Sequence, residues 1–168
     1  MEITLLLACE AFSINKMYYN KPGFQRTQEA REWSYKVFDE LNCSYNQQQM
    51  RLFREKFEPS HMGVEVTIVE RIPVDEFFKV GSWEISSKTF DRSNVEKPLI
   101  DLLFLPKYFT RSVPEGCNNL NLDDKYVSQV ISRKVPSPLA YTYLTITVKA
   151  VSNKDLFAWV KRDTSELL

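Results

Sequence analysis

Polar side chains that could do chemistry gather in one run of the chain, from Asp91 to Asp101. Within this run Asn94, Lys97 and Asp101 are three and four residues apart, so a helix would place them on one stripe. Asp91 lies just ahead of the N-terminus of such a helix. The run therefore predicts that carboxylate, amide and ammonium groups converge where a strand or loop turns into a helix.

A second acidic region is the pair Asp123-Asp124, which separates a turn-rich loop from a strand-like stretch that begins at Tyr126. A carboxylate at such a place can be presented from a rigid edge into a cleft. Adjacent residues that enter a strand point to opposite faces, so only one of the pair need reach a shared site. The two acidic regions could then meet.

The residue types in these two regions are typical of metal-dependent phosphodiester hydrolysis. That reaction needs an activated water, neutralisation of the charge on the phosphate and help for the leaving oxygen, all of which carboxylate-bound Mg²⁺ can supply. Mg²⁺ takes oxygen ligands and keeps several waters. A lysine beside the ion can hold the scissile phosphate, and this is the role that we expect for Lys97.

The most basic stretch of the chain, residues 11–26, contains no acid and interleaves its cations with aromatic residues. One interpretation is that the cations follow DNA phosphates while Tyr18 or Tyr19 stacks on an opened base. The other is that the aromatic rings cover the edge of a sheet, and the pattern leaves both open. The candidate DNA-binding residues in this stretch are Asn15, Lys16, Tyr18, Lys21 and Arg26.

Composition predicts one domain, residues 1–168, with enough apolar residues (43%) for a packed core. The 22 basic and 22 acidic residues give no net attraction to a polyanion, so any nucleic-acid surface must be local. The single histidine, His61, excludes chemistry that needs two, and we expect it to be structural or exposed. The three cysteines are far apart, which favours reduced thiols over a disulfide framework or zinc site.

No apolar run approaches the ~20 residues of a membrane span, and residues 1–10 lack the features of a signal peptide. We therefore expect a cytoplasmic protein. Apolar spacing, turn residues and strict alternation predict a small α+β fold, with helices packed on a mixed β-sheet. The expected strands are residues 3–8, 64–68, 126–135 and 141–151, with a hairpin or edge strand at 77–89; the expected helices are 28–41 (capped by Thr27), 46–57 and one within 93–104.

Each candidate also has a purely structural interpretation. Ser93 and Glu96 match a capping box, although Pro98 suits a helix that begins a few residues later. Asp91 could be an ordinary loop carboxylate, and Asp123-Asp124 could be the carboxylates of an ordinary turn. Lys97 has the alternative of a solvated helix lysine, and Asp101 that of a buried salt bridge or a partner of a metal-ligating residue.

Three of these segments together resemble the RusA family of Holliday junction resolvases. That family carries an early Pro/Ser-x-Asn-x-Tyr segment, then Asp-x-Asp-Asn-x-x-Lys-x-x-x-Asp, and later an Asp-Asp pair. In this chain the similar segments are Phe12-Ser13-Ile14-Asn15-Lys16-Met17-Tyr18-Tyr19, the run from Asp91 to Asp101 without a gap, and Asp123-Asp124-Lys125-Tyr126-Val127.

The resemblance implies a RusA-like fold and a homodimeric endonuclease that cuts four-way DNA junctions in recombination, repair or phage DNA processing. It implies that Asp91, Asp123 and Asp124 bind Mg²⁺, with Mn²⁺ as an alternative, and that Asp91, Lys97 and Asp124 are catalytic. Ser93, Asn94 and Asp101 would then support the metal ligands. Such an enzyme would work in the cytoplasm, at the nucleoid of a bacterial or phage-infected cell, with branched DNA and a second subunit as partners and no membrane.

This chain departs from the family pattern at one central position, because Ser93 stands where the family has its second aspartate. A serine hydroxyl is neutral and is a weaker metal ligand than a carboxylate. Either other carboxylates, Glu96 or Asp101 among them, complete the metal site, or the activity is reduced. The alternative function is therefore a non-catalytic relative that binds branched DNA. The connection from Phe104 to Asp123 is also longer than in the family pattern. It has two interpretations, an insertion that contacts substrate or a surface loop.

Overall fold

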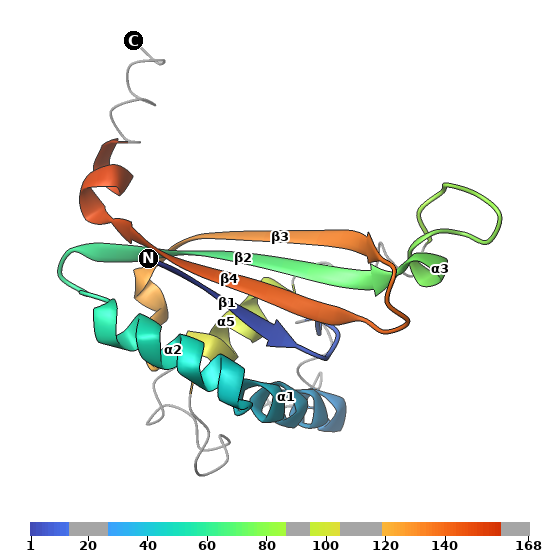
Figure 1. Cartoon of the computed structure of the whole chain (residues 1–168), viewed down its shortest axis with the longest axis horizontal. Helices are drawn as coiled ribbons and strands as arrows, with labels where there is room; N and C mark the ends of the chain where they lie inside the picture. The colour runs from blue at the N-terminus through green and yellow to red at the C-terminus, as the bar shows by residue number, and fades with distance from the viewer. Residues whose placement is uncertain (14–26, 87–94, 105–118, 159–168) are drawn as a thin grey trace.

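The β-sheet of this protein alternates buried and half-buried side chains along each central strand, as a sheet covered on one face requires. The computed structural model describes residues 1–13, 27–86, 95–104 and 119–158. Its sheet has the order β1-β4-β2-β3; β4 is antiparallel to β1 and β2, and β3 is parallel to β2 (Figure 1). The strands are β1 (Glu2–Leu7), β2 (Met62–Pro73), β3 (Val127–Ser137) and β4 (Tyr143–Ser152).

Helices α1 (Gln28–Leu41), α2 (Ser44–Lys56) and α5 (Glu96–Phe104) lie together on one side of the sheet (Figure 1). Thr27 caps α1 as expected, because its side chain accepts a hydrogen bond from the Ala30 backbone N–H at 3.1 Å. The parallel pair β2 and β3 requires a crossover connection, and α5 lies within it. The predicted small α+β fold with a mixed sheet is confirmed.

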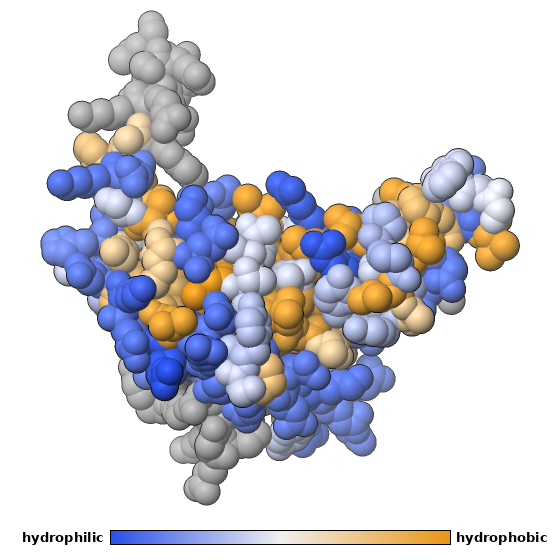
Figure 2. Space-filling view, viewed as in Figure 1, coloured by the Kyte–Doolittle hydropathy of each residue, from blue (hydrophilic) through white to orange (hydrophobic). Residues whose placement is uncertain are grey.

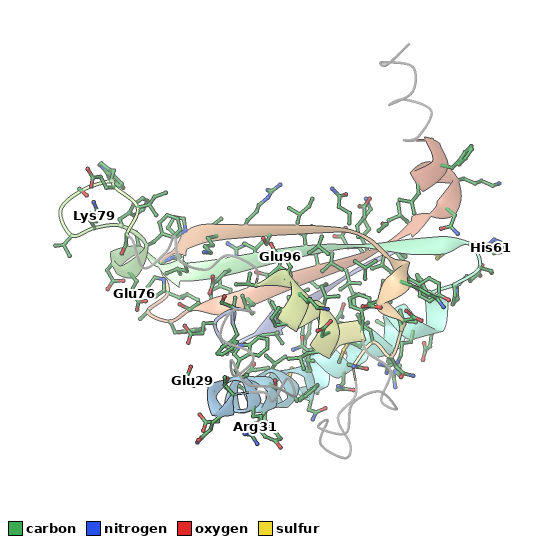
Figure 3. The ribbon with its side chains drawn as sticks, turned by 180° about the vertical axis from the view of Figure 1, so that it is seen from behind. Glu29, Arg31, His61, Glu76, Lys79 and Glu96 are labelled. Carbon is green, nitrogen blue, oxygen red and sulfur yellow. The ribbon has the colours of Figure 1, made fainter. Side chains whose placement is uncertain are left out.

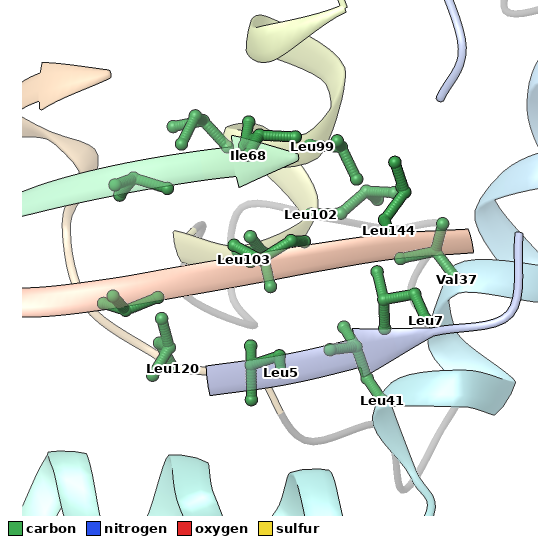
Figure 4. Packing of buried hydrophobic residues seen from close by; sticks show 14 of the residues in the cluster. Leu5, Leu7, Val37, Leu41, Ile68, Leu99, Leu102, Leu103, Leu120 and Leu144 are labelled. Carbon is green, nitrogen blue, oxygen red and sulfur yellow. The ribbon is translucent and has the colours of Figure 1, made fainter. Parts of the chain in front are cut away.

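Leucine side chains from α5, α1 and the sheet fill the space between the two layers (Figure 4). Leu99 and Leu103 of α5 are fully buried, and they face a sheet surface that includes Ile68 and Leu144. Burying a leucine side chain contributes ~2 kcal/mol by removing apolar area from water. The helix that carries Lys97 and Asp101 is thus fixed to the sheet by its apolar face.

Of the two alternatives expected over residues 77–89, the described part forms a minimal hairpin and not an edge strand of the sheet. β2 leads into a short helix, α3 (Val74–Phe77), and then into a loop closed by an antiparallel bridge between Phe78 and Ile85. Gly81 supports the tight turn at the tip with a positive φ of 72°. This loop projects from the end of the sheet and carries exposed apolar side chains (Figures 1 and 2).

The structure agrees with the expectation of reduced cysteines, but it contains a helix that was not predicted. Cys9 is a buried free thiol and Cys43 an exposed one, in agreement with reduced cysteines, while Cys117 lies outside the described residues. Burial, reinforced by the Glu40 carboxylate, raises the pKa of Cys9 to about 12, so this thiol is a poor nucleophile at neutral pH. Residues 153–158 are helical, which the sequence pattern did not predict.

Within the described part of the chain, no helix combines the length and the apolar composition needed to cross a bilayer.

Candidate functional site

Helix α5 brings Lys97 and Asp101 together on one exposed stripe, as their spacing predicted. The Lys97 ammonium lies 3.2 Å from Asp101 Oδ1, and the Asp101 side chain is only 16% exposed. The structural alternative for Asp101 was a buried salt bridge; the observed one is more exposed, because the Lys97 side chain is 64% exposed. Asp91, Ser93 and Asn94, the remaining residues of the predicted constellation, lie outside the described residues.

Glu96 is the first residue of α5, and its side chain points to the sheet (Figure 3). Its carboxylate accepts a hydrogen bond from the Ser132 hydroxyl on β3. A capping box with Ser93 would have made Glu96 the third residue of the helix, so the helix start favours the later boundary that Pro98 indicated. Glu96 therefore connects the start of α5 to the middle of β3.

The pair Asp123-Asp124 does not enter a strand directly, which corrects the expected alternation of the two side chains. The two residues instead begin a short 3-10 helix, η3 (Asp124–Tyr126), which leads into β3. Asp123 caps this helix: its Oδ1 accepts from the Lys125 backbone N–H at 3.0 Å, and its Oδ2 lies 3.2 Å from the Lys125 ammonium. Asp124 is exposed beside it. The two carboxylates thus have different surroundings.

The hydrogen bond from the Lys125 backbone N–H, helped by the Lys125 ammonium, lowers the pKa of Asp123 below its usual 3.8. A lowered folded pKa contributes stability above the unfolded value, and that stability is lost as the pH falls through the folded value. We therefore expect Asp123→Ala to lower the thermal midpoint at neutral pH, by an amount that shrinks as the pH is lowered through 3.8 and below. Asp123→Asn, which keeps the capping oxygen, should have the smaller effect. A midpoint difference that does not change with pH would contradict this assignment.

Backbone and side-chain hydrogen bonds hold the segment before η3 against α5. The Leu120 N–H donates to the Leu103 carbonyl at 2.9 Å, and the Asn119 amide donates to the Leu102 carbonyl at 3.0 Å. The Arg54 guanidinium of α2 donates to the Asn119 carbonyl, which connects α2 to the same segment. These contacts place Asp123-Asp124 at the C-terminal end of α5.

Glu96 and the segment before η3 consequently contact the sheet and the helix at opposite ends of α5. Glu96 at its start contacts Ser132, whereas Leu103 near its end contacts the segment that precedes η3. Along β3, Ser132 lies five residues beyond Val127, a separation of ~16 Å at the rise of a strand. The sequence indicated that Asp91 and Asp124 could lie close together. Asp91 lies outside the described residues, so this stays a prediction.

The predicted metal site needs several oxygen ligands close together. Across residues 1–13, 27–86, 95–104 and 119–158, no three His, Cys, Asp or Glu side chains form a group that could hold a metal ion. Asp101, Asp123 and Asp124 thus do not make a metal site on their own. His61 is exposed at one end of the sheet (Figure 3), in agreement with the expectation that it is structural or exposed.

The start of the basic stretch is firmly attached to the body of the protein. The Trp33 indole N–H donates to the Glu10 carbonyl at 2.8 Å, and the Phe12 ring stacks on the Trp33 ring with centroids 5.4 Å apart. The Ala11 N–H donates to Glu70 Oε1 at 3.1 Å. Phe12 is thus an aromatic residue that covers the protein interior. The candidate DNA-binding residues Asn15, Lys16, Tyr18, Lys21 and Arg26 lie outside the described residues.

Glu70 is a residue of interest that the sequence reasoning missed. It lies on β2, on the face covered by helices, and is only 2% exposed. It borders a pocket of about 280 Å³ at the start of α5, lined by Ile68, Glu70, Val95, Ser132, Arg133 and Lys134. The signal in the sequence was its place in the alternation of β2, two residues after Ile68, where a buried apolar residue would be expected.

Comparison of the sequence with known protein families finds no matching family, and comparison with curated proteins finds no match.

Proposed function

We propose that this protein is a Mg²⁺-dependent endonuclease that cleaves branched DNA, with four-way junctions as its substrate. The observation that carries the proposal is the ordered set of three polar segments and the elements on which two of them lie. The central run continues into α5, which lies in the crossover between the parallel strands β2 and β3. Asp123-Asp124 caps and begins η3, which contacts the same helix and leads into β3.

The donor chemistry of the acidic residues fits a hard divalent cation. Aspartate oxygens are ligands of the class that Mg²⁺ prefers. Both oxygens of Asp123 already bond Lys125, whereas Asp124 is exposed, so we assign Asp124 to the metal, together with Asp91. Bound there, Mg²⁺ would supply an activated water and charge neutralisation at the phosphate.

The cationic residues would hold the DNA. Lys97 lies on the exposed stripe of α5, and exchange of its Asp101 partner for a phosphate oxygen would place its ammonium on the substrate. Asp101 would keep the lysine extended until DNA arrives. Lys16, Lys21 and Arg26 are proposed to bind phosphates of the junction arms, which gives a protein of zero net charge a local basic surface. A four-way junction presents two equivalent strands, so we propose that a homodimer acts on it.

Selective binding tests the recognition half of this proposal without requiring turnover. With all divalent metal chelated, the protein is expected to bind a synthetic four-way junction more tightly than a linear duplex of the same arm sequence and length. Its affinity should fall steeply as salt is raised, because phosphate contacts release counterions. Equal affinity for junction and duplex would contradict junction recognition, and salt-independent binding would contradict phosphate contact.

The second candidate function, a non-catalytic protein that binds branched DNA, is favoured by Ser93 in place of an acidic metal ligand. If turnover has been lost through this serine, Ser93→Asp is expected to create or raise junction cleavage by at least ~10-fold, because a carboxylate binds Mg²⁺ more strongly than a hydroxyl. Cleavage rates of the two proteins on one labelled junction decide between the functions. A lower rate in Ser93→Asp than in an active wild type would show that the serine belongs to the mechanism.

A further inference from the structure

An apolar arm, residues 74–86, projects from one end of the sheet. Its Val80 and Trp83 side chains are 98% and 88% exposed, the highest values among the large hydrophobic residues that the structure describes. The arm points away from the rest of the protein, so its own sheet leaves these side chains uncovered (Figures 1 and 2). Contiguous exposed apolar residues are typical of an interaction site.

The arm has a defined shape of its own. The Lys79 N–H donates to the Glu84 carbonyl at 2.8 Å, and the Lys79 ammonium pairs with the Glu84 carboxylate. The Phe78 ring packs edge to face on the Trp83 ring, with centroids 5.6 Å apart. Both rings and Val80 line an open hollow of about 490 Å³. A partner therefore meets a preformed apolar surface, which reduces the entropy that is lost on binding.

The charge of the arm selects among partners. The arm carries three carboxylates, on Asp75, Glu76 and Glu84, and one ammonium group, on Lys79. Because Lys79 pairs with Glu84, the net charge of the arm comes from Asp75 and Glu76. Such a surface repels DNA phosphates and favours a partner that is apolar and cationic.

A surface with this chemistry lies at the same end of the sheet, on the face opposite the helices, which we call the open face. Arg71 alternates with the buried residues of β2, and its Nε donates to Thr145 Oγ1 on β4 at 3.1 Å. Its guanidinium also lies 6.0 Å from the centre of the Tyr143 ring. Arg133 is the register partner of Val69, two residues before Arg71, so it projects from the same face. Arg71, Arg133 and Tyr143 thus form the basic end of the open face.

The acidic residues of the open face are at its other end. Among the described strand residues, Glu2 and Glu65 project from this face, and both are register partners of Lys149. Beside the basic end, the turn between β3 and β4 instead exposes Leu139 and Tyr141, at 41% and 57%. The chain therefore carries two complementary surfaces: an acidic apolar arm with a hollow, and a basic end with projecting apolar side chains.

We infer that two copies of this protein form a symmetric dimer in which the arm of each copy lies on the basic end of the other. The arm extends past the end of its own sheet (Figure 1), so a second copy placed end to end brings its basic end under the arm. The arm carboxylates then face Arg71 and Arg133, and Tyr141 enters the hollow. Two-fold symmetry makes each contact twice. The inference deepens the proposed function, on which it rests for the use of a dimer at a four-way junction.

Sedimentation equilibrium of the full chain, without DNA and with divalent metal chelated, measures the dimer directly. The wild type is expected to be a dimer, and Val80→Asp is expected to raise the dimer dissociation constant at least ~10-fold, because it places a charge in an apolar contact. Val80 is 98% exposed in one copy, so this substitution leaves the fold intact. Tyr35→Asp is the matched control: Tyr35 is 53% exposed on α1, on the covered side of the sheet, and the variant should match the wild type. Thermal unfolding verifies that each variant is folded.

An exchange of charges tests which surfaces meet. The arm-reversed variant carries Asp75→Lys and Glu76→Lys, and the face-reversed variant carries Arg71→Glu and Arg133→Glu. Each alone should dimerise at least ~10-fold more weakly, because like charges meet. When the two are mixed, every arm meets a basic end of opposite charge, so a heterodimer with about wild-type affinity is expected. Glu55→Lys, a charge reversal at an exposed position of α2, should dimerise as the wild type does.

A wild type that is monomeric at ~100 μM chain would overturn the inference, as would a wild-type dimer in Val80→Asp. Two charge-reversed variants that stay monomeric when mixed would exclude the contact of arm with basic end. Loss of junction affinity in Val80→Asp with an unchanged dimer would assign the arm to DNA instead. If the face-reversed variant does not fold, Val80→Asp decides. Failure of the proposed function is distinguishable, since it appears as a wild-type dimer that neither prefers nor cuts junctions.

Discussion

Asp124→Asn is expected to slow cleavage of a four-way junction by at least ~100-fold, equivalent to ~2.7 kcal/mol of transition-state stabilisation. Asparagine keeps the size of the side chain and one oxygen, but it removes the negative charge that we assign to the metal. Junction affinity measured with metal chelated should be unchanged or slightly higher, because a negative charge near the DNA is lost. The measurement is the single-turnover cleavage rate beside a binding titration of the same preparation.

The neighbouring residue provides the control. Asp123→Asn keeps an oxygen that can accept the Lys125 N–H and removes the negative charge that pairs with the Lys125 ammonium, so its cleavage rate should stay within about threefold of wild type. Equal, large losses in both variants would show that the pair acts together on the metal. A wild-type rate in Asp124→Asn would remove this carboxylate from the reaction.

Leu103→Ala is expected to lower the free energy of unfolding by about 2–5 kcal/mol, because it leaves a cavity under α5. Leu103 is 0% exposed and packs between the helix and the sheet (Figure 4). Urea unfolding followed by far-UV circular dichroism measures the change. Junction cleavage should fall as well wherever the variant is partly unfolded, since α5 carries Lys97.

Leu6→Ala is the matched control, because Leu6 on β1 is 45% exposed and its truncation leaves no internal cavity. We expect a loss below about 1 kcal/mol for this variant. Equal losses in the two leucine variants would show that α5 is not fixed to the sheet as the structure has it.

The elements that the sequence predicted well are those whose signals are local. Thr27 could be recognised as an N-cap, and the spacing of Lys97 and Asp101 predicted their pairing, because caps and i,i+4 contacts depend only on neighbouring residues. Alternation in β2 predicted a strand, although the strand continues through Pro73. The strand order β1-β4-β2-β3 depends on contacts between distant segments and could not be obtained from these patterns.

The candidate site was harder to predict, because its chemistry depends on tertiary contacts. Glu70 lies in a position where alternation predicts an apolar side chain, and only the hydrogen bond from Ala11, 59 residues away in sequence, reveals its place in the pocket. Asp123 and Asp124 are alike in the sequence, yet one caps η3 and the other is exposed. The sequence pattern alone does not show which of the two carboxylates accepts a hydrogen bond from the backbone.

Cleavage of an end-labelled four-way junction by the wild-type protein, with Mg²⁺ present or chelated, tests the central proposal most directly. Paired nicks at symmetrical positions in two opposing strands are expected with Mg²⁺, and no nicks are expected when the metal is chelated. Absence of nicks with both Mg²⁺ and Mn²⁺, or equal cleavage in the presence of chelator, would contradict the central proposal.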